Sequence, residues 1–222
     1  MSMSITRHPD DANLMSFAAG ALPEPLAAAV AAHAALCPDC QAQVRDLQKL
    51  GGMLLEGIDR GQPRLTIAVP SASDGTEAAA APASRGSSRH PLADAVIPLT
   101  IARRYGFASA RVPWRWLAPG VRYVPLALSP GVTGDLRLLK IAPGRKMPEH
   151  GHGGCEMTLV LDGAYSDETG VFRRGDIQDV DGELEHQPVV DSRDGCICLV
   201  AAERPARFKG LFSRLLQPWT GM

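Results

Sequence analysis

Residues 144–163 read Gly-Arg-Lys-Met-Pro-Glu-His-Gly-His-Gly-Gly-Cys-Glu-Met-Thr-Leu-Val-Leu-Asp-Gly. This short stretch holds three side chains of the kinds that bind metals: His150, His152 and Glu156. Two histidines two residues apart on a strand point to the same face, and the carboxylate can come from the next strand or the bend before it. A fourth candidate, His186, follows the next Gly-Asp turn. The pattern predicts a metal site inside a β-rich domain.

The bulk composition is that of an ordinary folded protein. The chain has 222 residues, 45% of them hydrophobic, and a formal net charge of -1. It therefore has no global basic field to attract nucleic acid or an anionic membrane, and we expect neither as a direct partner. No apolar run approaches the roughly 20 residues of a spanning helix, and the N-terminus lacks the apolar region of a signal peptide. Five cysteines are an odd number, which argues against a disulfide framework. We expect a cytoplasmic protein.

The chain changes character along its length, which predicts an α + β multidomain protein. Residues 1–70 show helical periodicity and predict a small all-α domain. The His-Cys pattern described below predicts that zinc staples this domain. Residues 71–95 are rich in Ala, Ser and Pro and predict a flexible linker, which lets the two domains move separately. Residues 96–207 hold short strand candidates between Pro-Gly and Asp-Gly turns, which predict an all-β sandwich or barrel. Residues 208–222 form a tail.

The helical region contains three apolar stripes. Asp10 or Asp11 can cap a first helix that ends at Gly20. A second helix begins near Pro23. A third begins at Cys40. The apolar residues of this region that can face a partner are Leu14, Phe17, Leu47, Leu50 and Leu54.

A compact ligand pattern, His33-Ala-Ala-Leu-Cys37-Pro-Asp-Cys40, joins the second and third helices. On a helix, residues i and i+4 share a face, so His33 and Cys37 can grip one ion, which Cys40 reaches from the next helix. A tetrahedral structural zinc needs a fourth ligand, and His8 is the nearby candidate. Two other interpretations compete: a redox Cys-Pro-Asp-Cys pair, and ordinary buried cysteines beside a core histidine.

The order His8, then the H-x3-C-x2-C pattern, resembles the zinc-binding anti-sigma domain. The resemblance implies that the domain binds a sigma factor of the extracytoplasmic-function type. Binding would block the surfaces that the sigma factor uses to bind core RNA polymerase. One departure is the family's fourth helix, because residues 61–70 are a poor helix.

The stretch 144–163 resembles the first cupin motif, which implies a jelly-roll barrel. The second motif fits less well: Gly175-Asp176 opens it and His186 takes the ligand place, but Asp181 stands where the family has proline. Three histidines and a glutamate suit zinc, or else iron, manganese or nickel. A metal ion with an open coordination position would act as a Lewis acid. A zinc ion with four protein ligands and no open position is structural or part of a sensor.

Three further cysteines are candidates for oxidant sensing. Cys155 is next to Glu156, within reach of the predicted metal shell, and Cys196 and Cys198 share one face of a strand. Thiolates are oxidised readily when their pKa is low. For the Cys196–Cys198 pair the alternative is simple core packing.

The order of zinc anti-sigma domain, linker and cupin domain resembles the ChrR-type anti-sigma factors over almost the full chain. The resemblance implies a one-to-one complex with a group IV sigma factor, released in response to singlet oxygen or related oxidants sensed through the cupin domain. It implies Zn²⁺ in the N-terminal site and Zn²⁺ or another divalent metal in the cupin site. A rival hypothesis is a cupin dioxygenase or isomerase with a helical appendage, and a third is a storage or sugar-binding module.

Overall fold

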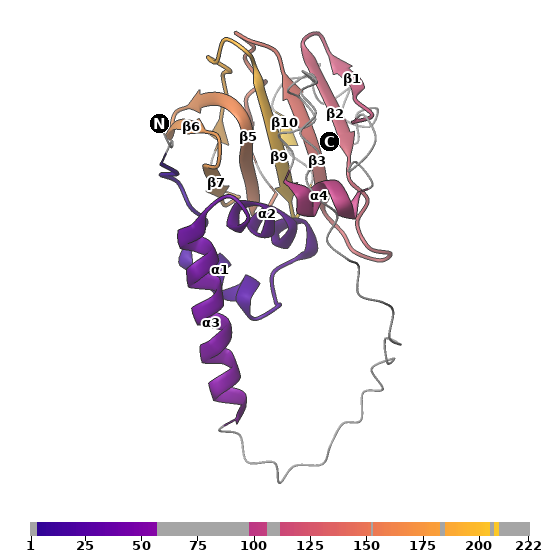
Figure 1. Ribbon diagram of the computed structural model, residues 1–222. Helices are drawn as coiled ribbons and strands as arrows, with labels where there is room; N and C mark the ends of the chain where they lie inside the picture. The colour runs from indigo at the N-terminus through magenta and orange to yellow at the C-terminus, as the bar shows by residue number, and fades with distance from the viewer. Residues whose placement is uncertain are drawn as a thin grey trace, which may run out of the picture.

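The computed structural model describes residues 4–56, 98–105, 112–151, 153–182, 185–204 and 207–208. In this part of the chain, three N-terminal helices lie against an antiparallel β domain (Figure 1). The predicted order of a helical domain followed by a β domain is confirmed. The predicted linker at 71–95, residues 61–70 and nearly all of the predicted tail lie outside the described residues.

The three predicted helices form where their periodicity and end signals place them. Helix α1 (Asp11–Ala18) is capped by Asp10, whose side chain accepts the Asn13 N–H at 2.6 Å. Helix α2 spans Glu24–Ala34 and α3 spans Pro38–Glu56. None of the helices in the described ranges is long and apolar enough to cross a bilayer.

The β domain has two sheets. The larger sheet has the order β1 (Arg115–Ala118), β2 (Val121–Pro125), β3 (Asp135–Ile141), β9 (Cys196–Ala202), β5 (Glu156–Asp167) and β6 (Gly170–Arg173), and β7 (Ile177–Val180) also pairs with β5. The smaller sheet consists of β10 (Arg207–Phe208), β4 (His150–Gly151) and β8 (Glu185–His186). Every paired strand runs antiparallel to its neighbour.

One short helix contradicts the prediction that everything after about residue 97 is β. Helix α4 spans Leu99–Arg104. It is too short to show a clear apolar period, and its contacts are tertiary: Ile101 is buried, and Arg104 forms an ion pair with Glu24 at the start of α2. Tertiary contacts of this kind decide short helices more than intrinsic propensity does.

In the central strands β3, β5 and β9 both faces of the large sheet are buried, each in a different core. Met157, Leu159 and Leu199 face the helices, where they share one core with Leu26 and Val30 of α2. The alternate residues of the same strands point into the β domain, where a second core contains Leu139, Ile141, Val160, Cys196 and Cys198. Period-two alternation therefore divides each strand between the two cores.

The shared core corrects the expectation that the two domains move separately. Helix α2 packs across β5 and β9 at one end of the large sheet, and α1 and α3 extend beyond that end (Figure 1). The buried His33 also donates a hydrogen bond from Nδ1 to the Gly175 carbonyl, which precedes β7, at 2.9 Å. The helical and β domains are therefore in direct contact.

Candidate metal centres

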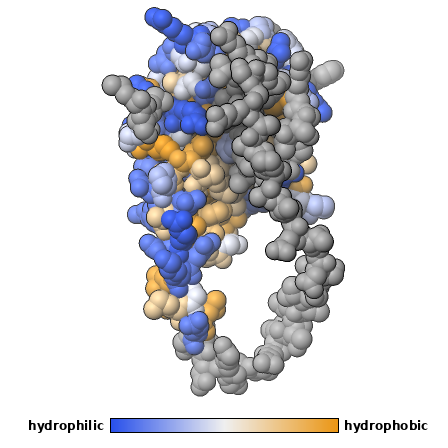
Figure 2. Space-filling view, in the orientation of Figure 1, coloured by the Kyte–Doolittle hydropathy of each residue, from blue (hydrophilic) through white to orange (hydrophobic). Residues whose placement is uncertain are grey.

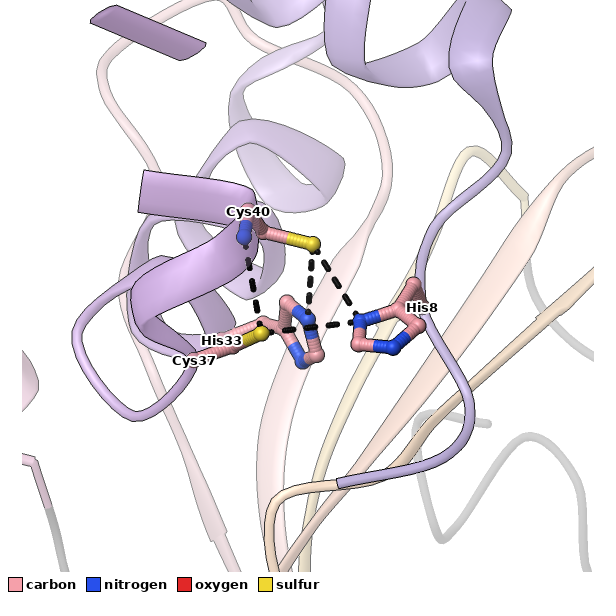
Figure 3. A group of neighbouring side chains, drawn as sticks. All are labelled: His8, His33, Cys37 and Cys40. Carbon is pink, nitrogen blue, oxygen red and sulfur yellow. Dashed lines mark hydrogen bonds between the residues drawn. The ribbon is translucent and has the colours of Figure 1, made fainter. Parts of the chain in front are cut away.

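Four predicted ligands converge at the N-terminal cluster (His8, His33, Cys37 and Cys40), as Figure 3 shows. Their ligand atoms all lie within 4.8 Å of one another. His8 is exposed, whereas the other three residues are buried. The four residues come from four places: the segment before α1, the end of α2, the connection between α2 and α3, and the first turn of α3.

The chain between α2 and α3 places the second, third and fourth of these ligands. The Cys37 N–H donates to the His33 carbonyl at 2.8 Å, so the backbone keeps a helical turn after α2 ends. Pro38 then begins α3, and its first turn brings the Cys40 N–H to 3.5 Å from Cys37 Sγ. The H-x3-C-x2-C spacing thus produces a local three-ligand pocket.

The distances inside the cluster are those of a coordination tetrahedron. His8 Nδ1 lies 3.3 Å from Cys40 Sγ and 3.5 Å from Cys37 Sγ, and His33 Nε2 lies 3.3 Å from Cys40 Sγ. With Zn–S near 2.3 Å and Zn–N near 2.0 Å, the sulfur–nitrogen edge of a tetrahedron is about 3.5 Å. The three sulfur–nitrogen distances are therefore close to those that a tetrahedral zinc site requires.

The electrostatics of the cluster also suit a cation. Burial lowers the pKa of His33 to about 4, so its imidazole is neutral at physiological pH, the form that binds metals. Burial, with Cys37 beside it, raises the pKa of Cys40 to about 12. A bound divalent ion reverses this preference, because it stabilises the thiolate that ligates it. The donor set of two thiolates and two imidazoles is typical of structural zinc.

Two residues of the second predicted site line a cavity of about 90 Å³ between the two sheets. Glu156 at the start of β5 and His186 on β8 both line this cavity, and both are buried. The backbone of His150 on β4 pairs in register with His186. The side chain of His150 and the whole of His152 lie outside the described residues, so the four-ligand cupin set stays a prediction.

A polar chain behind His186 was missed by sequence reasoning. Tyr165 donates to Gln178 Oε1 at 2.8 Å, Gln178 donates to Asp167 Oδ2 at 2.7 Å, and the same oxygen lies 2.8 Å from His186 Nδ1. Burial raises the pKa of the Asp167 carboxyl, but hydrogen bonds from Thr169, Gln178 and His186 together lower it below its ordinary value. The ionised Asp167 contacts Nδ1 of His186 and so fixes the orientation of the imidazole ring.

The remaining cysteines do not fit the picture of reactive thiolates. All five cysteines of the chain are free. Cys155, predicted to reach the cupin metal shell, instead faces the helices, with Sγ 3.5 Å from Asp179 Oδ1, because it alternates with the inward Glu156. Burial, followed by the charge of Asp179, raises the pKa of Cys155 to about 12.

Cys196 and Cys198 do share a face, as predicted, with their sulfurs 3.4 Å apart in the inner core. The contact with Cys196, together with burial, raises the pKa of Cys198. A raised pKa disfavours the thiolate form, so the predicted condition for sensing, a low thiol pKa, is not met at Cys155 or Cys198.

Three helices around a cluster of metal-type ligands, packed on an antiparallel β domain, define a class of two-domain proteins with a candidate metal centre in the helical domain. Residues 103–205 match the family model described as the ChrR Cupin-like domain. The chain is 39% identical over 222 residues to the anti-sigma-E factor ChrR of Cereibacter sphaeroides, covering 98% of this chain and 99% of that protein. The chain therefore belongs to the family of ChrR anti-sigma factors.

A solved structure agrees with this assignment. The crystal structure of Rhodobacter sphaeroides SigE in complex with the anti-sigma ChrR matches with a TM-score of 0.67 and 38% identity. The match covers 90% of this chain and 99% of the other. It therefore includes both the helical and the β regions.

Proposed function

We propose that this chain is a cytoplasmic anti-sigma factor, a regulator rather than an enzyme. It holds one extracytoplasmic-function-type (group IV) sigma factor in a one-to-one complex and keeps it from RNA polymerase. Two findings support the proposal: the chain is 39% identical to an anti-sigma-E factor, and it resembles a ChrR structure determined together with SigE.

The observation that carries the proposal is an apolar surface on the second half of α3. This α3 stripe consists of Leu50, Met53, Leu54 and Leu55, which are 53%, 69%, 65% and 71% exposed. In Figure 2 it forms an orange group at the lower end of α3. An exposed apolar stripe on a helix favours burial against a partner rather than against water.

The stripe changes the predicted contact face. Leu14, which was predicted for the contact face, is 1% exposed and belongs to the core. Phe17 and Leu47, also predicted for that face, are partly buried against the same core. Leu50 and Leu54 stay in the face, and Met53 and Leu55 join it. The surface that we propose to contact the sigma factor is thus the C-terminal end of α3.

We assign different tasks to the two metal centres. Zinc at the N-terminal cluster holds α2, α3 and the segment before α1 together, as structural zinc does in small domains. A divalent metal in the cupin cavity would be held by His150, His152, Glu156 and His186, and it would supply a Lewis-acidic centre there. Singlet oxygen or a related oxidant acts at this cavity, and the sigma factor is then released.

The test is co-expression with the extracytoplasmic-function sigma factor encoded beside this chain. We expect a one-to-one complex by light scattering, two metal ions per anti-sigma chain, and loss of sigma-dependent transcription in vitro. Addition of a singlet-oxygen generator should restore transcription. A sigma factor that stays free and fully active in the presence of this chain contradicts the proposal.

A further inference from the structure

Groups of the β domain form hydrogen bonds with the histidines of the N-terminal cluster or with the chain beside them. The groups that make these contacts form a β7 clamp, defined as Gly175, Asp176, Ile177 and Asp179. In Figure 1 the segment before α1 runs beside β6 and β7 before the helix begins. That segment contains His8, the cluster ligand that is farthest in sequence from the other three.

Asp176 holds the chain just before His8. Its Oδ1 accepts the backbone N–H groups of Thr6 at 2.7 Å and Arg7 at 3.1 Å, and its Oδ2 accepts the Arg173 N–H of its own turn at 2.9 Å. The Ile177 N–H donates to the Arg7 carbonyl at 3.2 Å. Asp176 is only 3% exposed, so these bonds are shielded from competing water.

Asp179 holds the chain just after His8. Its Oδ2 accepts the Asp10 N–H at 3.1 Å and the side-chain amide of Asn13 at 2.8 Å. Asp10 in turn caps α1. His8 therefore lies between two anchored points, one at each end of a short segment, and both anchors are carboxylates of the β domain.

Gly175 holds the second histidine of the cluster. Its carbonyl accepts the His33 Nδ1–H at 2.9 Å, which leaves Nε2 to face Cys40 Sγ. Metal-binding histidines commonly donate their other ring N–H in this way, and the bond fixes the tautomer and the ring orientation. Gly175 has a φ of +93°, and a Cβ there would lie 2.6 Å from the Ile5 side chain, so a side chain is strained at this position.

We propose that Asp176, Asp179 and the Gly175 carbonyl are positioning groups of the N-terminal metal site, so that the β domain controls how firmly the helical domain keeps its metal. The inference rests on the proposed metal binding at the cluster. The clamp hydrogen-bonds directly to the His33 side chain and to the backbone on either side of His8. The positions of the two cysteines depend instead on the local helix geometry.

The test uses the full-length chain loaded with Co²⁺. A thiolate-to-cobalt charge-transfer band reports the N-terminal cluster alone, because the predicted cupin ligand set has no cysteine. The variants are Asp176→Ala, Asp179→Ala, the conservative Asp179→Asn, and Asp191→Ala as an exposed carboxylate control. The rate of Co²⁺ transfer to excess chelator is measured by the decay of the band, and thermal unfolding is followed in parallel.

Release should be about 10- to 100-fold faster for Asp176→Ala and about tenfold faster for Asp179→Ala, as for other groups that orient metal ligands. Asp179→Asn keeps an acceptor oxygen and should restore slow release, and Asp191→Ala should match the unchanged chain. A purely structural role would lower the unfolding temperature and leave the band and the release rate unaltered.

The proposal is overturned if both alanine variants release Co²⁺ at the rate of Asp191→Ala. If the buried Asp176→Ala variant does not fold, Asp179→Ala decides, because that side chain is partly exposed. An unchanged chain that never develops the thiolate band overturns the metal site itself, and the clamp with it. Absence of the band in the unchanged chain is distinct from the other negative result, in which the band forms and the clamp variants release Co²⁺ at the control rate.

Discussion

The two candidate metal centres are built in opposite ways. The N-terminal cluster is closed: four protein ligands surround one point, with sulfur–nitrogen distances of 3.3 to 3.5 Å. The candidate cupin site lies beside a cavity of about 90 Å³, which Glu156 and His186 line. A closed set of thiolates and imidazoles stabilises a fold, whereas a cavity beside the ligands admits a small reactant. The comparison teaches that the helical domain is suited to hold its shape and the β domain to respond.

The largest expected effect tests the closed centre. Replacing Cys37 and Cys40 together with serine should remove the N-terminal zinc and abolish sigma inhibition, because structural zinc contributes about 10 kcal/mol or more at such sites. Zinc content and inhibition of transcription are measured on the same preparation. Cys155→Ser is the matched control and should retain both. A double variant that still inhibits would show that zinc does not staple the helical domain.

The next effect tests the candidate cupin site. The double variant Glu156→Ala with His186→Ala should lose one metal ion per chain and keep the other. We expect inhibition of the sigma factor to persist and its release by oxidant to disappear. Metal analysis and transcription assays with a singlet-oxygen generator check this, with Glu185→Ala as the neighbouring control. Loss of inhibition would mean that the two centres do not divide their tasks as proposed.

A smaller effect sharpens the assignment of binding to the helical domain. Changing Leu50 and Leu54 of the α3 stripe to aspartate should weaken the sigma complex about 30-fold, roughly 2 kcal/mol, because exposed apolar anchors dominate such interfaces. Zinc content and the unfolding temperature should not change, since both side chains are more than half exposed. Titration calorimetry measures the affinity. Gln48→Asp, on another face of α3, should bind normally.

The smallest effect concerns the group behind His186. Asp167→Asn should lower the metal affinity of the cupin site about tenfold, since carboxylates that orient a histidine ligand typically contribute that much. The N-terminal metal should be unaffected. Competition with a metal indicator gives both affinities. Equal losses at the two sites would point to general unfolding instead of a local role.

The sequence predicts the features that depend on local periodicity. Apolar positions at helical spacing predicted α2, and short runs between turn signals predicted the strands Asp135–Ile141, Gly170–Arg173 and Ile177–Val180. Neighbouring residues on a strand face opposite sides of the sheet, and this places Cys155 on the face opposite to Glu156. The prediction that Cys155 reaches the cupin metal shell was therefore wrong.

The groups that sequence reasoning missed depend on long-range register. Asp167 meets His186 only because the end of β5 lies beside β8, and nothing in the spacing of the two residues indicates this. Asp176 lies in a Gly-Asp turn and Asp179 in a short strand, and neither pattern indicates a contact with the N-terminal segment. Their partners lie about as far away in the sequence as this chain allows, and such contacts have no local signal.

The β7 clamp has a consequence for the order in which this protein is made. Thr6 and its acceptor Asp176 are separated by 170 residues. At the usual 5–20 residues per second, the ribosome needs roughly 10 to 30 seconds to make the clamp after His8 has been polymerised. During that interval the nascent helices carry their zinc ligands and their α3 stripe without the β domain. A newly made chain is therefore in a different state from a finished one when it first meets zinc or a sigma factor.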